Sequence, residues 1–318
     1  MGTSRISARW IFNPLCTMSR PLPADAFAEF RTHCETEAIE LAMLEDLYEG
    51  DITTEAIVPK SHRSRAIICA KSAGVIAGVR VMEKIFSMSK NKMNVVVRKQ
   101  DGEHVQAGDV IAEITGSTET LLLCERTVLN FMQRMSGIAT KTAEWVALIA
   151  HTPAKLLDTR KTAPGLRYFD KEAVRIGGGH NHRFGLYDMM LIKDNHIDAA
   201  GGVAEALRRA KEYRKQKRLD VKIEIEVRSH AELQEALRFA PDIVLLDNFS
   251  IEDLKKAVAF ARAKSPTTLL EASGGVSQKT LCAIAETGVD FISAGELTHS
   301  VSAMDISMKI VPLSNVAT

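Results

Sequence analysis

Charged side chains stand directly after short apolar runs at six places in the second half of the sequence. The groups that follow these runs are Asp158–Lys161, Lys193–His196, Glu226, Asp247–Asn248, Glu271–Gly275 and Ser293–Glu296. Apolar runs of this length, separated by amphipathic segments, are typical of buried parallel strands. Because parallel strands end at one edge of their sheet, we expect the six groups to meet in one site.

Positive charge dominates one part of this predicted site. Its members are Arg160, Lys161, Arg183 and Lys193, with His182 beside them. Neighbouring cations repel one another unless an anion neutralises them, and the arginine fork matches a carboxylate or a phosphate. The pattern therefore predicts an anionic substrate. The alternative explanation for single members is an ion pair with a nearby aspartate, namely Asp158, Asp188 or Asp194.

Two acids, Glu226 and Asp247, end neighbouring predicted strands and lie 21 positions apart in the chain. Carboxylates placed in this way can bind Mg²⁺ or hold ribose hydroxyls. They could equally act as a general acid and base, or pair with cations across the site. The sequence alone leaves these roles open.

Glycine-rich turns follow the last two predicted strands, at Ser273-Gly274-Gly275 and at Ala294-Gly295. In parallel barrels this is where backbone N–H groups commonly hold a phosphate, and glycine lets the ligand approach the backbone closely. Turns that merely connect two elements are the alternative. His180 and His182 could ligate a metal, but the sequence offers no evident third ligand.

The elements that must position these residues fall into two regimes. Residues 24–50 have helical spacing, and short β-rich runs follow at 66–70, 74–81, 93–97, 110–114 and 120–124. We expect these runs to form an antiparallel sheet in a small domain over residues 24–128. A long helix from about Arg126 to Ile149 then leads into alternating strands and helices over 129–299, which favours an α/β barrel over an open sheet. The segment 300–318 is expected to return to the small domain.

Composition limits the classes of protein that remain. The 318 residues carry a net charge of +1, which argues against a dedicated nucleic-acid binder, and contain no apolar run long enough for a membrane span. Five cysteines without C-x-x-C spacing suggest free thiols in the cytoplasm. Residues 1–23 are read as an extension, either a transit peptide or, preferably, a variable segment.

Long motifs in this chain resemble the quinolinate phosphoribosyltransferases, also called carboxylating nicotinate-nucleotide pyrophosphorylases. They are "ERTVLNFMQRMSGIAT" (125–140), "DTRKTAPGLR" (158–167), "GGGHNHRFGLYDMMLIKDNH" (177–196), "IEIEV" (223–227), "LLDN" (245–248), "EASGG" (271–275) and "SAGELTHS" (293–300). The resemblance spans roughly residues 25 to 310. It implies an N-terminal α/β sandwich and an open, seven-stranded parallel α/β barrel.

The resemblance also implies an activity and roles for named residues. Quinolinate would receive phosphoribose from phosphoribosyl pyrophosphate with Mg²⁺, lose CO₂ and become nicotinate mononucleotide. The residues implied around quinolinate are Thr159, Arg160, Lys161, His182, Arg183 and Lys193, with Arg126 supplied by a partner subunit. Those implied around the phosphoribosyl group are Glu226 and Asp247, which also hold Mg²⁺, and Ser273, Gly274, Gly275, Ala294, Gly295 and Glu296. Lys161, Glu226 and Asp247 are the candidate catalytic residues, in a homodimer or a larger assembly such as a hexamer.

Three rival functions remain at this level. A nicotinate-specific transferase would grip one carboxylate rather than two, and two arginines with two lysines favour the dicarboxylate. A Schiff-base lyase would use Lys161 or Lys193 as its nucleophile. A carrier module could be built on residues 101–116, which resemble a biotinyl or lipoyl hammerhead but lack its modified lysine.

Overall fold

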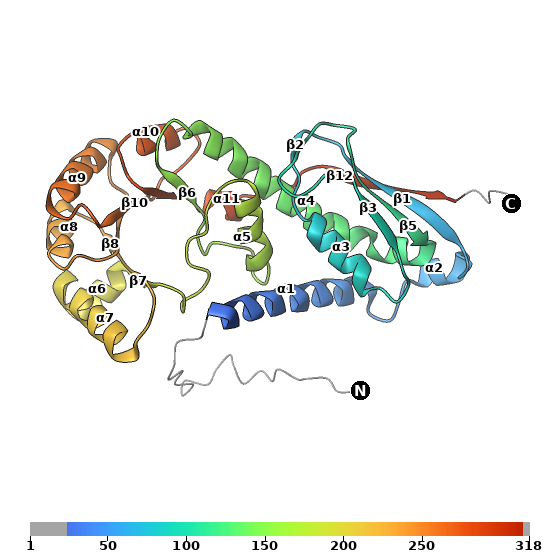
Figure 1. The fold of residues 1–318 in the computed structure, drawn as a ribbon, viewed down its shortest axis with the longest axis horizontal. Coiled ribbons are helices and arrows are strands. Elements are labelled where there is room, and N and C mark those ends of the chain that lie inside the picture. The colour runs from blue at the N-terminus through green and yellow to red at the C-terminus, as the bar shows by residue number, and fades with distance from the viewer. Residues whose placement is uncertain (1–23, 314–318) are drawn as a thin grey trace.

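The computed structural model describes residues 24–313. The extension expected over residues 1–23 lies outside this range, as do residues 314–318. No helix within the described range is long and apolar enough to cross a membrane. Two lobes are joined by one long helix, α4 (Thr118–Leu148), as Figure 1 shows.

The small lobe is built on a four-stranded antiparallel sheet in the order β12-β1-β5-β3, which confirms the expected sheet type. Its strands are β1 (Arg63–Ala70), β3 (Asn94–Val97), β5 (Val110–Ser117) and β12 (Ile306–Pro312). A separate two-stranded sheet pairs β2 (Gly74–Val75) with β4 (His104–Val105). The other helices of this lobe are α1 (Ala24–Leu47), α2 (Ile52–Ile57) and α3 (Val79–Met88). Buried and more exposed residues alternate along β1, as a sheet with one face on the core requires.

Two strands expected in the small lobe are not strands over their full length. The run 74–81 is a strand only at β2, because Val79 already begins α3. The run 120–124 lies inside α4, which begins eight residues earlier than the sequence predicts. Leu121, Cys124 and Val128 are all buried, and their spacing of three and four residues is that of a helix face. The short apolar run was compatible with either element, and its interpretation as a strand was wrong.

The large lobe contains six parallel strands in the order β6-β11-β10-β9-β8-β7. Their bounds are β6 (Lys155–Leu157), β7 (Met190–Ile192), β8 (Ile223–Val227), β9 (Ile243–Asp247), β10 (Leu269–Ser273) and β11 (Phe291–Ser293). A single parallel bridge, Leu157↔His180, stands on the free side of β6 where a seventh strand is expected. Among residues 24–313 no pairing closes the ring from β7 to this bridge, so the barrel is open.

Helices follow the barrel strands along the chain and cover the outside of the sheet (Figure 1). They are α5 (Arg167–Ile176), α6 (Asp194–Ala200), α7 (Val203–Lys217), α8 (His230–Leu237), α9 (Ile251–Lys264), α10 (Leu281–Ala285) and α11 (Glu296–His299). The strands are buried over most of their length, as a parallel sheet with covered faces requires. The alternating pattern in the sequence therefore identified the correct architecture.

Helix α4 carries much of the core between the lobes. Trp145 near its end is almost fully buried, and Phe131 packs on Phe169 of α5 with ring centroids 4.5 Å apart. Fully burying a phenylalanine contributes on the order of 1.5–3 kcal/mol. The helix runs without a break through residue 128, where the sequence analysis placed the end of the small domain.

The last strand returns from the barrel to the small lobe. β12 pairs antiparallel with β1, from Ser64↔Pro312 to Ala70↔Ile306. The segment that leads into β12 passes close to α4, where a Cβ atom on Gly137 would collide with the backbone oxygen of Ser302. Glycine at this position lets the return segment lie against the helix.

We expect the substitution Gly137→Ala to destabilise the protein by about 1–3 kcal/mol, because the added methyl group must push the Ser302 backbone away from α4. Urea denaturation followed by circular dichroism measures this change. Asn130→Ala, at an exposed position of the same helix, is the control and should change the free energy of unfolding by less than about 0.5 kcal/mol. A stabilising Gly137→Ala substitution would contradict the close approach.

Candidate active site at the barrel mouth

The carboxyl ends of the six barrel strands lie at one edge of the sheet, as the sequence predicts. The pairing register places Ser273 beside Asp247 and Glu226 beside Leu245, so successive strand ends are aligned. The residues that follow each strand therefore share one mouth. The chemistry of this mouth depends on which charges the strands bring together.

Glu226 and Asp247 are the acidic part of the mouth. Both are partly buried, at the ends of β8 and β9. Burial raises the pKa of Glu226, the charge of Asp247 raises it further, and Lys193 opposes both effects. Because such interactions weaken with distance, the three side chains must lie near one another. Two carboxylates and one ammonium group can hold a hydroxylated or cationic ligand here.

A backbone feature holds Asp247 in place. Asn248 adopts a left-handed conformation with φ of 56°, and its side-chain amide donates a hydrogen bond of 2.7 Å to Asp247 Oδ2. Gly274 of the next strand end lies directly against Asn248, where a Cβ atom would collide with the Asn248 side chain. The glycine after Ser273 is therefore required by packing as well as by its own φ of 87°.

Arg160 and Arg183 are the cationic part of the mouth. Burial lowers the pKa of Arg183, and the nearby charge of Arg160 lowers it further. Arg160 Nε is buried without a hydrogen-bond partner among the described residues. Arg183 Nη1 donates a bond of 3.3 Å to the carbonyl of Met189. A buried guanidinium nitrogen without an acceptor, beside a second arginine, is what an anion-binding site needs before its ligand arrives.

Lys161 lies where the loop after β6 meets the loop after β11. Its carbonyl accepts a hydrogen bond of 2.9 Å from Thr298 Oγ1, and its backbone N–H donates to Thr159 Oγ1 at 3.0 Å. A Cβ atom on Gly295 would lie 2.9 Å from Lys161 Cδ. The backbone around Lys161 is thus fixed on both sides, while its side chain is exposed at the mouth.

The two glycine-rich turns differ in whether their polar groups already have hydrogen-bond partners within the protein. Gly274 and Gly275 are exposed and have positive φ angles. The backbone N–H of Ala294 already donates to the carbonyl of Leu157 at 2.9 Å. The carboxylate of Glu296 pairs with Lys141 Nζ at 2.9 Å. Ala294 and Glu296 therefore have partners within the protein, whereas the turn after β10 is open to a ligand.

Arg126 is the one predicted site residue that the fold places elsewhere. It is exposed on α4, eight residues before Arg134, which contacts Asp170 of α5 and the carbonyl of Thr298. Eight residues of helix correspond to about 12 Å, here toward the small lobe. The single chain does not bring Arg126 to its own barrel mouth.

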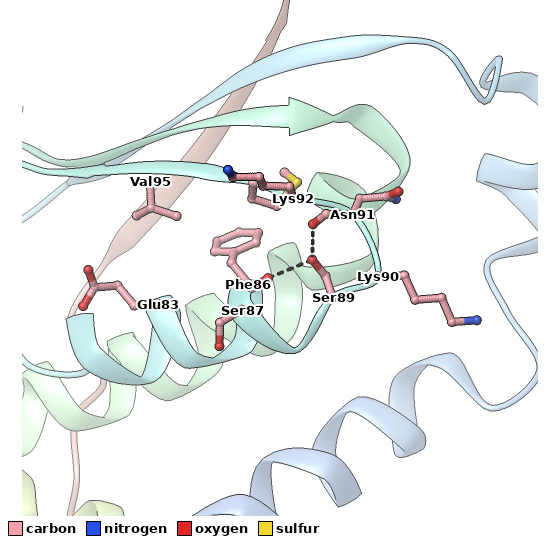
Figure 2. A pocket seen from close by; sticks show the side chains of 9 residues that line it. Glu83, Phe86, Ser87, Ser89, Lys90, Asn91, Lys92 and Val95 are labelled. Atoms are coloured by element: carbon pink, nitrogen blue, oxygen red, sulfur yellow. Dashed lines mark hydrogen bonds between the residues drawn. The ribbon is translucent and has the colours of Figure 1, made fainter. Parts of the chain in front are cut away.

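The small lobe has a pocket of its own, with a volume of about 460 Å³, between the end of α3 and β3. Figure 2 shows that Phe86 and Val95 line one part of it and that Ser89 donates hydrogen bonds to the carbonyls of Phe86 and Asn91. The lining brings together no set of converging acids and cations comparable to the strand ends. The strand ends at the barrel mouth are therefore the stronger candidate for the active site.

Comparison with known proteins agrees with this arrangement. Residues 51–136 match the model of the quinolinate phosphoribosyl transferase N-terminal domain, and residues 138–309 match the C-terminal domain of the same family. The chain belongs to this family.

Named relatives cover most of the chain. Quinolinate phosphoribosyltransferase (decarboxylating) 2a, mitochondrial, of Nicotiana tabacum is 45% identical over 288 residues, covering 86% of this chain and 81% of the relative. The probable nicotinate-nucleotide pyrophosphorylase (carboxylating) of Bacillus subtilis is 43% identical over 272 residues, covering 86% and 91%. The solved structure of the nicotinate-nucleotide pyrophosphorylase from Francisella tularensis superposes with a TM-score of 0.80 at 38% identity, covering 88% of this chain and 96% of that one.

Membership in the quinolinate phosphoribosyltransferase family gives the activity. The enzyme transfers phosphoribose from phosphoribosyl pyrophosphate to quinolinate and releases CO₂, which yields nicotinate mononucleotide and pyrophosphate for NAD biosynthesis. Residues 101–116, considered above as a carrier module, form the turn before β4, β4 itself, the connection to β5 and most of β5 in the small lobe. The predicted function, transfer of phosphoribose to quinolinate, is confirmed.

Sequence reasoning missed part of the phosphoribosyltransferase mouth. Glu224 is fully buried on β8, two residues before Glu226 and therefore on the same face of the strand. Glu271 was expected to follow a strand, but it lies inside β10 and is buried, and His182 lies beside both acids. The alternation in "IEIEV" indicates this arrangement. Two glutamates two positions apart in a strand lie on the same face, so only the second can stand at the strand end and the first must lie inside the strand.

A buried ion pair supports the loops of the phosphoribosyltransferase mouth. Lys171 Nζ lies 2.5 Å from Asp158 Oδ1, and both side chains are almost completely buried. Asp158 also accepts hydrogen bonds from Asn181 Nδ2 at 2.6 Å and from the His182 backbone N–H at 2.9 Å. This single carboxylate therefore ties α5 and the segment 180–183 to the end of β6.

We expect Lys171→Met to destabilise the enzyme by about 3–5 kcal/mol, because it leaves the Asp158 carboxylate buried without its cation. The double variant Lys171→Met/Asp158→Asn should be less destabilised than the sum of the single variants by about 1–3 kcal/mol. Denaturant unfolding of the four proteins gives this coupling energy. Additive effects would show that the two side chains do not depend on each other.

Proposed function

We propose that the barrel mouth carries out the family reaction and that its positively and negatively charged residues bind different substrates. The cations bind the two carboxylates of quinolinate, and the acids and glycine turns bind the phosphoribosyl group. The observation that carries this proposal is the buried, unpaired Nε of Arg160 beside Arg183 at the ends of the barrel strands. Both features favour a ligand with more than one negative charge.

The quinolinate site, in this proposal, is formed by the loop after β6, the segment before β7 and the first residue after β7. Its residues are Thr159, Arg160, Lys161, His182, Arg183 and Lys193. The two arginines can each hold one carboxylate with a planar pair of hydrogen bonds, and the lysines add positive charge. Two carboxylates held at fixed positions would orient the ring nitrogen toward the sugar.

The phosphoribosyl site is proposed at the ends of β8 to β11. Glu226 and Asp247 would grip ribose hydroxyls and a Mg²⁺ ion, and their partly buried, adjacent carboxylates are the hard oxygen ligands that Mg²⁺ prefers. Ser273, Gly274, Gly275 and Gly295 would cradle the 5′-phosphate. Ala294 and Glu296 would shape the turn around Gly295, since the Ala294 N–H bonds to Leu157 and the Glu296 carboxylate pairs with Lys141. When bound, Mg²⁺ would neutralise charge on the departing pyrophosphate.

Catalysis would then depend on positioning and electrostatics. The ring nitrogen of quinolinate attacks the anomeric carbon as pyrophosphate leaves, through a transition state with oxocarbenium character. Glu226 and Asp247 favour the positive charge that develops on the sugar. The positive charge gained by the ring nitrogen then draws electrons from the 2-carboxylate, whose carbon leaves as CO₂, and a proton takes its place on the ring. Lys161, at the junction of the two loops, would contact both substrates.

The proposal includes assembly and location. Arg126 would reach the mouth of a partner subunit in a homodimer or a larger assembly such as a hexamer, because it lies about 12 Å along α4 from Arg134, on the side of the small lobe. Cytoplasmic location is proposed from the cysteines: Cys34, Cys69, Cys124 and Cys282 are free thiols. The Nicotiana tabacum relative named above is called mitochondrial, so a fluorescent fusion of the full chain tests this point.

The proposed roles predict that Lys161→Ala abolishes turnover without unfolding the protein, since the Lys161 side chain is exposed. The assay supplies quinolinate, phosphoribosyl pyrophosphate and Mg²⁺ and measures CO₂ and nicotinate mononucleotide together. We expect kcat to fall by more than about a thousandfold, the scale of losing a group that stabilises the transition state. EDTA should stop the unmodified enzyme. Near-normal activity of the variant would remove Lys161 from the mechanism, and turnover in EDTA would remove the metal.

The contribution of Arg126 across the interface predicts complementation between two inactive variants. Arg126→Ala and Lys161→Ala subunits, co-expressed with different tags, would form mixed dimers with one intact mouth. Purification over both tags should give about half of the normal activity per dimer, because one of two symmetric sites is whole. If the doubly tagged dimers are as inactive as either parent, Arg126 does not act in the partner's site.

A further inference from the structure

Three buried side chains meet inside the barrel, one layer below the mouth. His182 Nε2 lies 3.0 Å from Glu224 Oε2 and 3.6 Å from Glu271 Oε2. The polar atoms of the three groups all lie within 4.8 Å of one another, and both glutamates are at most 1% exposed. None of the four carboxyl oxygens has a hydrogen bond of good geometry to a described residue, although the Ser293 hydroxyl lies near Glu271 and the two carboxyl groups interact with each other. Buried polar atoms normally have a hydrogen-bond partner. These oxygens therefore require a partner that the positions of the non-hydrogen atoms do not show.

A metal ion is the first candidate partner, because one histidine and two carboxylates can ligate a divalent cation. The hydrogen bonding of His182 argues against it. The backbone N–H of Arg183 donates a bond of 2.8 Å to His182 Nδ1, so Nδ1 carries no proton. In a neutral ring the proton is then on Nε2, the atom that faces the glutamates. Nε2 therefore points an N–H group at the acids and has no lone pair for a metal.

A proton is the remaining partner. Two facing carboxylates deep in the barrel would repel each other, and a protonated carboxyl group is a hydrogen-bond donor. Burial and the charge of Glu224 together raise the pKa of Glu271 to about 8, while His182 opposes them. Burial also raises the pKa of Glu224 to about 7, so Glu271 is the acid that keeps its proton to the higher pH. Burial also lowers the pKa of His182, which keeps the ring neutral. The other groups around the cluster are Asp158, Lys171, Arg183, Lys193, Glu226 and Ser293.

We propose that Glu271 is a positioning residue of the quinolinate site, held as a neutral carboxylic acid that donates a hydrogen bond to the Glu224 carboxylate. The cluster then carries one negative charge, which fixes the His182 ring through its Nε2–H group and leaves Arg183 and Lys193 free for the substrate. Ionised Glu271 would add a second buried charge that competes with quinolinate for these cations. This inference rests on the quinolinate site proposed above.

The test is the pH dependence of kcat/KM for quinolinate between pH 6 and 9.5, at saturating phosphoribosyl pyrophosphate. In the unmodified enzyme Glu271 loses its proton as the pH rises, so kcat/KM should fall, approaching about tenfold per pH unit at the alkaline end. Glu271→Gln keeps a neutral donor of the same shape and cannot ionise, so this fall should disappear. Glu271→Leu lacks the donor and should lower kcat/KM at every pH. Glu212→Gln, an exposed change on α7, is the control and should follow the unmodified enzyme.

The outcomes separate the inference from the proposed function. Parallel alkaline falls in the unmodified enzyme and in Glu271→Gln would overturn the role of Glu271 while leaving the reaction in place. Absence of product from the unmodified enzyme at any pH would instead reject the function itself. Infrared spectroscopy of the unmodified enzyme is independent of whether a variant folds. It should show a protonated carboxyl band at pH 7 that vanishes by pH 9.5, and no such band would overturn the proposal.

Discussion

The register of the parallel strands is the constraint on which the rest of the active site depends. Each strand end delivers one or two charged side chains, and neighbouring strands decide which charges meet. Alignment of Ser273 with Asp247 and of Glu226 with Leu245 puts the acids beside the glycine turn that follows β10. A shift of β8 by one residue would turn both of its glutamates to the other face of the sheet. The chemistry of the mouth is therefore fixed by backbone pairing before any side chain contacts a substrate.

Gathering unlike charges at one edge creates a second problem, since acids and cations in the same mouth would neutralise each other. The fold separates them by depth and by dedicated partners. Asp158 is satisfied by Lys171 below the surface, and Asp170 takes a bidentate bond from Arg134. Arg160 by contrast keeps a buried nitrogen without a partner. The charges that support the loops are thus paired within the protein, whereas a buried nitrogen of Arg160 at the mouth stays available to an anion.

The sequence predicted much of this arrangement because burial and charge leave clear local signals. Near-continuous apolar runs identified all six barrel strands, and the charges after them identified the mouth. The prediction was wrong where a short apolar run fits either a strand or a helix, as at 120–124. There the helical spacing of the buried residues is recognised only when the buried face of α4 is known. The family resemblance implied a seventh strand, but among the described residues only His180 pairs with Leu157 at that position, in a single bridge.

Other parts of the site could not be predicted because they depend on contacts between distant segments. Nothing in the local sequence says that the Ala294 N–H bonds to Leu157, or that Glu296 pairs with Lys141 on α4. Glu224 and Glu271 lie 47 positions apart and meet only because β9 alone stands between β8 and β10. The tautomer of His182 likewise depends on a backbone N–H that only the folded loop directs at its ring.

The pairing of β12 with β1 also affects how the enzyme is made. β1 lies between β12 and β5, so the small lobe needs a strand that is translated after the whole barrel. While the ribosome is still producing the barrel, one edge of β1 has no partner, and exposed edges of this kind invite pairing with other chains. Contacts this distant in the chain also close slowly, since a long loop must be ordered first. The last strand thus completes the first lobe, and a nascent chain stopped just short of it would keep a finished barrel and an open sheet.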